Sequence, residues 1–148
     1  MEAQSDFKEL LTLFNAKGVE YIIVGAYALA HLGAPRATGD LDILVRSTPD
    51  NAEAVLAALN DFGFGSLGLS TTDFTTPAQV VQLGHPPVRI DLLTTISGVT
   101  WEQADENAIP GDYGSEPVRY LGRAEFIANK KACGRPQDLA DIEALEGD

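Results

Sequence analysis

The chain has 148 residues, of which 45% are hydrophobic and 22% charged, a balance that is ordinary for a globular protein. Its net charge of −12 argues against wrapping a nucleic-acid duplex, because neutralising phosphates requires clustered Lys and Arg side chains. The apolar runs are too short to cross a bilayer, and residues 1–15 lack the basic start and apolar centre of a signal peptide. One cysteine, Cys133, excludes an internal disulfide framework and fits a reducing cytosol. We therefore expect a single domain over residues 1–148, located in the cytoplasm and without a membrane partner.

The first third of the chain predicts a helix, a strand, a glycine turn, a short helix and a second strand. Apolar residues recur with a helical period over Ser5–Ala16, which predicts an amphipathic helix that covers a sheet. The apolar run Tyr21–Val24 predicts a buried strand that stops at Gly25. A short helical patch at residues 26–32 ends in glycine and proline breakers, and a second apolar run follows at residues 41–45.

The remaining elements follow from the same signals of periodicity, capping and turn residues. In chain order we expect a helix at 48–62, strands at 79–83 and 88–93 joined as an antiparallel hairpin, a short helix at 101–108, a short strand within 113–121, and helices at 123–132 and 136–145. Residues 64–76 are rich in Gly, Ser and Thr and allow no assignment. The pattern predicts a mixed α/β domain of the α+β kind, with a small, partly antiparallel sheet and helices mainly on one face.

Three aspartates lie within the apolar strands. Because strand side chains alternate between faces, Asp40 and Asp42 project to the same side of their strand. Asp91 lies on the later strand and shares its face with Arg89. A buried carboxylate is costly unless it pairs with a base, accepts hydrogen bonds or binds a metal. Carboxylate oxygens are the ligands that Mg²⁺ prefers, so three convergent acids suit a phosphoryl-transfer site with one or two ions.

A purely structural interpretation of these acids is also available. Asp40 and Asp42 could cap the start of the strand, while Asp91 pairs with Arg89 or Arg36. Asp-x-Asp is a weak signal by itself, and spacing alone does not separate the two interpretations.

The turn at Gly25 is a second feature that fits a phosphoryl-transfer site. A strand that ends in glycine and leads into a helix points backbone N–H groups forward, where they can bind phosphate. The turn matches neither the G-x-x-x-x-G-K-[ST] loop nor G-x-G-x-x-G, so those two mechanisms are set aside. The alternative is a glycine required only for tight packing.

Residues 24–29 (VGAYAL) and 36–42 (RATGDLD) together resemble the nucleotidyltransferase superfamily of the DNA polymerase β type. More narrowly, they resemble the small nucleotidyltransferase-like proteins of the abortive-infection toxin group. In that group a Gly-[Gly/Ser/Ala] turn precedes Arg-x-[Thr/Ser]-x-Asp-x-Asp, and a third Asp lies on a later strand, here residues 88–91 (VRID). A closing Lys followed by Arg-x-x-Asp-x-x-Asp has counterparts in Lys130 and residues 135–141. The resemblance spans about residues 19–145.

The resemblance implies roles for particular residues. Asp40, Asp42 and Asp91 would be the catalytic residues and the ligands of Mg²⁺, or of Mn²⁺ in its place, with Asp91 the candidate base. The residues expected to contact the nucleotide are Gly25, Ala26, Tyr27, Arg36, Thr38 and Lys130. Many active members of the group have Ser after the glycine, and Ala26 offers no hydroxyl to a phosphate. Phosphate binding would therefore depend on the backbone and on a basic side chain.

The leading hypothesis is a Mg²⁺-dependent nucleotidyltransferase that moves a nucleoside monophosphate from a nucleoside triphosphate to a hydroxyl. The acceptor would be an RNA end, a protein or a small molecule, and the toxin group implies an antitoxin-like protein partner. One alternative is a nucleotide-binding or interaction module that kept the fold but has weak or no turnover. Another is a structural domain in which every acid is salt-bridged.

Overall fold

The computed structural model describes residues 4–36, 38–85 and 88–146. The α-helices are α1 (Ser5–Ala16), α2 (Gly25–His31), α3 (Pro49–Leu59), α4 (Thr71–Thr75), α5 (Trp101–Asn107), α6 (Arg123–Cys133) and α7 (Pro136–Glu146). The strands are β1 (Tyr21–Val24), β2 (Asp40–Val45), β3 (Val80–His85), β4 (Val88–Leu93), β5 (Ile109–Tyr113) and β6 (Glu116–Tyr120). Two short helical turns, η1 (Asn60–Phe64) and η2 (Gly65–Leu67), connect α3 to α4. Within these ranges, no helix combines the length and apolar character that a membrane span requires.

The six strands form one mixed sheet in the order β3-β4-β2-β1-β6-β5. β1 pairs antiparallel with β2 and parallel with β6, and β2 pairs parallel with β4. The two outer pairs, β3 with β4 and β5 with β6, are antiparallel hairpins. All four residues of β1 are buried, which explains why this short strand is a continuous apolar run rather than an alternating one.

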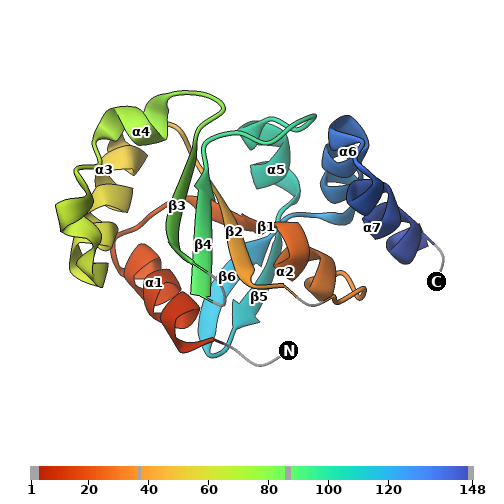
Figure 1. The fold of residues 1–148 in the computed structure, drawn as a ribbon, viewed down its shortest axis with the longest axis horizontal. Helices are drawn as coiled ribbons and strands as arrows, with labels where there is room; N and C mark the ends of the chain where they lie inside the picture. The colour runs from red at the N-terminus through yellow and green to blue at the C-terminus, as the bar shows by residue number, and fades with distance from the viewer. Residues whose placement is uncertain (1–3, 37, 86–87, 147–148) are drawn as a thin grey trace.

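Helices lie on both sides of the strands in the view of Figure 1, with α1, α3 and α4 to the left and α5, α6 and α7 to the right. α1 packs against α3 and contacts both β4 and β6. Its buried side chains, Phe7, Leu10, Leu11 and Phe14, recur with the helical period and join the main core. The core extends beyond the space between this helix layer and the sheet, because it also contains Phe126 of α6 and Leu145 of α7. The two central strands of the sheet are β2 and β1.

The register of the central strands decides which side chains meet. In the parallel β2–β4 pair, Asp42 lies beside Asp91 and Asp40 lies beside Arg89. On the other side of β2, Asp42 is paired with Val24, the last residue of β1. The glycine turn after β1 is thereby placed next to the acids of β2.

The α+β class with a small, mixed and partly antiparallel sheet, predicted from the sequence, is confirmed. Strand Val88–Leu93 begins and ends where it was predicted. The turn of the β3–β4 hairpin was predicted at residues 84–87, but Gly84 and His85 belong to β3, and residues 86–87 lie outside the described residues. β5 was not predicted, because its sequence IPGDY contains a proline and a glycine, both of which are depleted in strands.

Candidate active site

Three carboxylates converge where β2 and β4 lie side by side. Asp40, Asp42 and Asp91 each offer one oxygen, and these oxygens lie within 4.8 Å of one another. Asp91 is buried, whereas Asp40 and Asp42 are partly exposed, so the cluster has a route to solvent. Like charges on neighbouring strands repel each other, so this arrangement needs a compensating cation. Hard oxygen ligands at this separation fit a divalent ion such as Mg²⁺.

Gly25 places a backbone turn directly against this cluster. Its φ of +66° lies in the left-handed region that a residue with a Cβ rarely adopts. A Cβ built at this position would overlap the Oδ2 atom of Asp42 and lie 3.0 Å from its Cγ. The glycine is therefore required twice, once for the bend and once because the Asp42 carboxylate occupies the space in front of it.

The carboxyl group of Asp42 is perturbed by its surroundings. The pKa of Asp42 is raised from 3.8 to about 6, chiefly by desolvation and secondly by the nearby charges of Asp91 and Asp40. The positive charges of Lys130 and Arg89 act in the opposite direction. The carboxyl group of Asp42 thus ionises less readily than an ordinary aspartate.

Arg89 contributes one of these positive charges through a bidentate ion pair. Its Nε donates to Asp91 Oδ1 at 3.0 Å, and its Nη2 donates to Asp91 Oδ2 at 2.9 Å. The same Nε lies 3.7 Å from Asp40 Oδ1. The hydrogen bonds and the charge of Asp91 raise the pKa of the guanidinium above its ordinary value. The pairing of Asp91 with Arg89 and the convergence of the three acids, which the sequence offered as alternatives, occur together.

A search among curated proteins returns no sequence match. The model of the aminoglycoside-2''-adenylyltransferase family, in contrast, matches residues 6–133. The chain belongs to this family. Membership confirms the predicted nucleotidyltransferase relationship, while the narrower resemblance to the toxin group stays a prediction.

Solved structures of nucleotidyltransferases share the fold of this family member. A protein of Thermotoga maritima assigned to the nucleotidyltransferases aligns with a TM-score of 0.59 at 10% identity, over 95% of this chain and 88% of the other. The lincosamide antibiotic adenylyltransferase LnuA, solved with lincomycin bound, aligns with a TM-score of 0.57 at 13% identity, over 98% and 97% of the two chains. ANT(2'')-Ia, solved with adenylyl-2''-tobramycin, gives 0.54 at 13% identity, over 94% and 84%.

In this adenylyltransferase-family chain, Lys130 of α6 lies near enough to the acid cluster for its charge to act on Asp42. Its side chain is buried, its ammonium lies 5.3 Å from the centre of the Phe126 ring, and its charge lowers the pKa of Asp42. The Nζ atom also lies 3.5 Å from Oδ1 of Asp138. Lys130 is therefore held in place by Asp138 and Phe126, and its contact with a nucleotide stays a prediction.

The other predicted nucleotide contacts have partners within the protein. Arg36 donates from Nε to Asp141 Oδ1 at 3.1 Å, which ties the loop before β2 to α7. The Thr38 hydroxyl accepts from the Asp40 backbone N–H at 3.1 Å and so holds the first residue of β2. Both residues thus position the start of the strand that carries the acids, and their contact with a nucleotide stays a prediction.

Tyr27 lies in an aromatic group rather than beside the acids. Its ring packs edge-on against Phe7 of α1 at 5.9 Å and against Tyr113 of β5 at 5.7 Å between ring centres. Burial raises the pKa of its hydroxyl, which therefore stays protonated at neutral pH. The role indicated by these contacts is packing, and stacking on a base stays a prediction.

The sequence reasoning missed the structural role of Asp138 and Asp141. Both belong to the closing Arg-x-x-Asp-x-x-Asp motif, for which no packing role was predicted, and they are 1% and 3% exposed. Asp138 accepts from the backbone N–H and the guanidinium of Arg135, at 3.1 and 2.7 Å. The sequence contains a signal for their burial, because Asp138 and Asp141 share one helical stripe with the buried Ile142 and Leu145.

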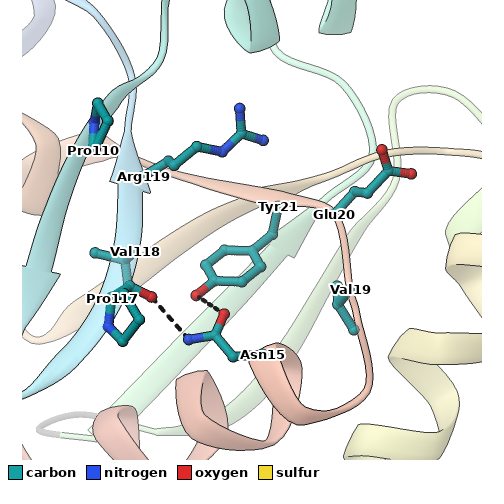
Figure 2. Close-up of a pocket in the computed structure, with 8 residues that line it drawn as sticks. All are labelled: Asn15, Val19, Glu20, Tyr21, Pro110, Pro117, Val118 and Arg119. Atoms are coloured by element: carbon teal, nitrogen blue, oxygen red, sulfur yellow. Dashed lines mark hydrogen bonds between the residues drawn. The ribbon is translucent and has the colours of Figure 1, made fainter.

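A separate pocket of about 450 Å³ lies at the other end of β1, where Tyr21 begins the strand. Figure 2 shows the Tyr21 hydroxyl donating to Asn15, and Asn15 donating to the carbonyl of Pro117. Arg119 also lines this pocket but is paired with Asp105 at 2.7 Å. The pocket is lined mostly by apolar groups, and none of the three clustered aspartates lines it. We therefore do not place the chemistry there.

Proposed function

We propose that this protein is a metal-dependent adenylyltransferase that moves AMP from ATP to a hydroxyl group of a small molecule. The observation that carries the proposal is the convergence of Asp40, Asp42 and Asp91 in front of the Gly25 turn. Family membership and the shared fold support the reaction class. The proposed acceptor class follows LnuA and ANT(2'')-Ia, both named for antibiotics or resistance to them.

The three carboxylates would hold Mg²⁺, or Mn²⁺ in its place, which when bound offsets the negative charge of the triphosphate and polarises its α-phosphorus. In the transfer, the acceptor oxygen forms a bond to the α-phosphorus while the bond to the bridging oxygen breaks and pyrophosphate leaves. The hydroxyl proton passes to the carboxylate of Asp91, the acid proposed as base. The backbone N–H groups of Gly25 and Ala26 would donate to phosphate oxygens, since the first N–H groups of a helix lack intrahelical acceptors. Lys130 would offset charge on the leaving group.

Calorimetric titration with ATP tests this proposal. We expect binding in the presence of Mg²⁺ that EDTA removes and that Asp40→Asn abolishes. Glu53→Gln, on the exposed surface of α3, is the matched control and should bind like the wild type. Metal-independent binding, or binding that survives Asp40→Asn, would contradict the proposed site.

A nucleotide-binding module without turnover is the second candidate. Two features favour it. Ala26 stands where the sequence resemblance implies a serine in many active members, and both oxygens of Asp91 accept hydrogen bonds from Arg89. Incubation with α-labelled ATP and a panel of aminoglycosides, lincosamides, RNA ends and proteins separates the two functions. Label transferred to a small molecule supports the enzyme. ATP binding without transfer to any acceptor supports the module.

The antitoxin-like partner and the toxin role are proposals that rest on sequence resemblance alone. Transfer of label to an RNA end in the same assay would support them over the small-molecule acceptor. The net charge of −12 favours the small molecule, because a polyanionic acceptor is repelled by the surface as a whole.

A further inference from the structure

Arg89 has contacts that the proposed reaction does not use. Its guanidinium donates to both carboxylate oxygens of Asp91, at 3.0 and 2.9 Å, and lies 3.7 Å from Asp40. These are two of the three carboxylates that would hold the metal. A guanidinium and a divalent ion would therefore compete for the same negative charge.

The position of Arg89 follows from the strand register. It precedes Asp91 by two residues on the same face of β4, and it lies beside Asp40 of β2. The fork of an arginine matches the geometry of a carboxylate, so the pair with Asp91 forms within a single strand without distorting the sheet. In the absence of a metal, this contact reduces the repulsion among the three acids.

The two cations of the site differ in their freedom to move. Lys130 is buried and is held between Asp138 and the Phe126 ring. The side chain of Arg89 is 30% exposed, whereas that of Asp91 is 11% exposed. The guanidinium therefore has a path to solvent along which it can leave the acids while the carboxylate stays in place.

We propose that Arg89 is a displaceable internal cation that occupies the acid cluster in the metal-free protein and leaves it when a divalent ion binds. The proposal rests on the metal site of the proposed function, and it adds that metal binding and nucleotide binding are coupled through Arg89. A guanidinium released at the mouth of the site needs an anion, and the triphosphate supplies one. Metal and nucleotide then bind cooperatively, so that free metal binds weakly and the metal–nucleotide pair binds tightly.

Mn²⁺ binding, measured by electron paramagnetic resonance at constant pH, tests this coupling without any turnover. In the wild type, Mn²⁺ alone should bind weakly, and a non-hydrolysable ATP analogue should tighten it. Arg89→Gln should bind Mn²⁺ alone about 5- to 100-fold more tightly than the wild type. The ATP analogue should then increase the Mn²⁺ affinity of this variant less than it increases that of the wild type. Arg46→Gln removes an exposed ion pair of the same kind with Glu20 and should leave Mn²⁺ affinity unchanged.

The outcomes separate this inference from the proposed function. Weaker Mn²⁺ binding by Arg89→Gln would mean that Arg89 orients Asp91 for the metal, which overturns displacement. Equal affinity in the two proteins, with loss in Asp40→Asn, would keep the metal site and overturn the role of Arg89. Mn²⁺ affinity unaffected by Asp40→Asn would overturn both. Melting curves give a second measurement: Mn²⁺ should raise the melting temperature of Arg89→Gln more than that of the wild type.

Discussion

At the scale of single residues, Gly25 allows the turn after β1 to lie directly against the carboxylate of Asp42. Gly25→Ala should destabilise the protein by two effects, the left-handed backbone and the overlap with Asp42. Gly18→Ala is a matched control, because Gly18 has a similar φ of +70° but open space at its Cβ position. We expect about 1 kcal/mol for the control and about 2 kcal/mol or more for Gly25→Ala in urea unfolding. Equal losses would show that Asp42 does not occupy the space in front of the turn.

The raised pKa of Asp42 predicts how metal-free stability depends on pH. The folded pKa of about 6 exceeds the ordinary value of 3.8, so the folded state binds more protons between these values. Stability should therefore fall as pH rises from about 4 to about 6, and Asp42→Asn should remove this loss, worth at most about 3 kcal/mol. Urea unfolding of both proteins in EDTA, across this pH range, measures the difference. Parallel stability profiles for the two proteins would contradict the assignment.

At the scale of secondary structure, α7 holds basic side chains near the site through two buried aspartates. Asp138 binds Arg135 and Lys130, and Asp141 binds Arg36, so one helix holds two of the predicted nucleotide contacts. Asp138→Asn leaves the buried ammonium of Lys130 without its partner and should cost about 2–4 kcal/mol in urea unfolding. Glu143→Gln, on the exposed face of the same helix, should cost less than about 0.5 kcal/mol. A small loss for Asp138→Asn would mean that α7 does not support the site.

Sequence and structure agree best where the signal is local. Alternation on β2 placed Asp40 and Asp42 on one face, and the helical period placed α1 and α6. The convergence of Asp91 with them depends on the parallel register of β2 and β4, which no local pattern contains. The same limit applies to β5, whose strand conformation comes from pairing with β6 in spite of its Pro and Gly. The triad could be suspected from the sequence, whereas its bridge to Arg89 could only be offered as an alternative.

At the scale of the whole molecule, the charge of −12 bears on acceptor choice. A polycationic acceptor, such as an aminoglycoside, is attracted by the general field of the surface, and salt screens that attraction. The KM for a cationic acceptor should therefore rise several-fold between about 50 and 300 mM salt, while the KM of a neutral acceptor changes little. Steady-state kinetics with a cationic and a neutral acceptor of similar size would measure the difference. Equal salt dependence would show that the surface charge does not guide the acceptor.

The central claim is that the three carboxylates of β2 and β4 hold a divalent ion in front of the first glycine turn. Anomalous diffraction from crystals soaked in Mn²⁺ and a non-hydrolysable ATP analogue tests it directly. We expect a manganese peak ligated by Asp40, Asp42 and Asp91, with the triphosphate against Gly25. A nucleotide bound elsewhere, or a manganese peak away from these three residues, would contradict it.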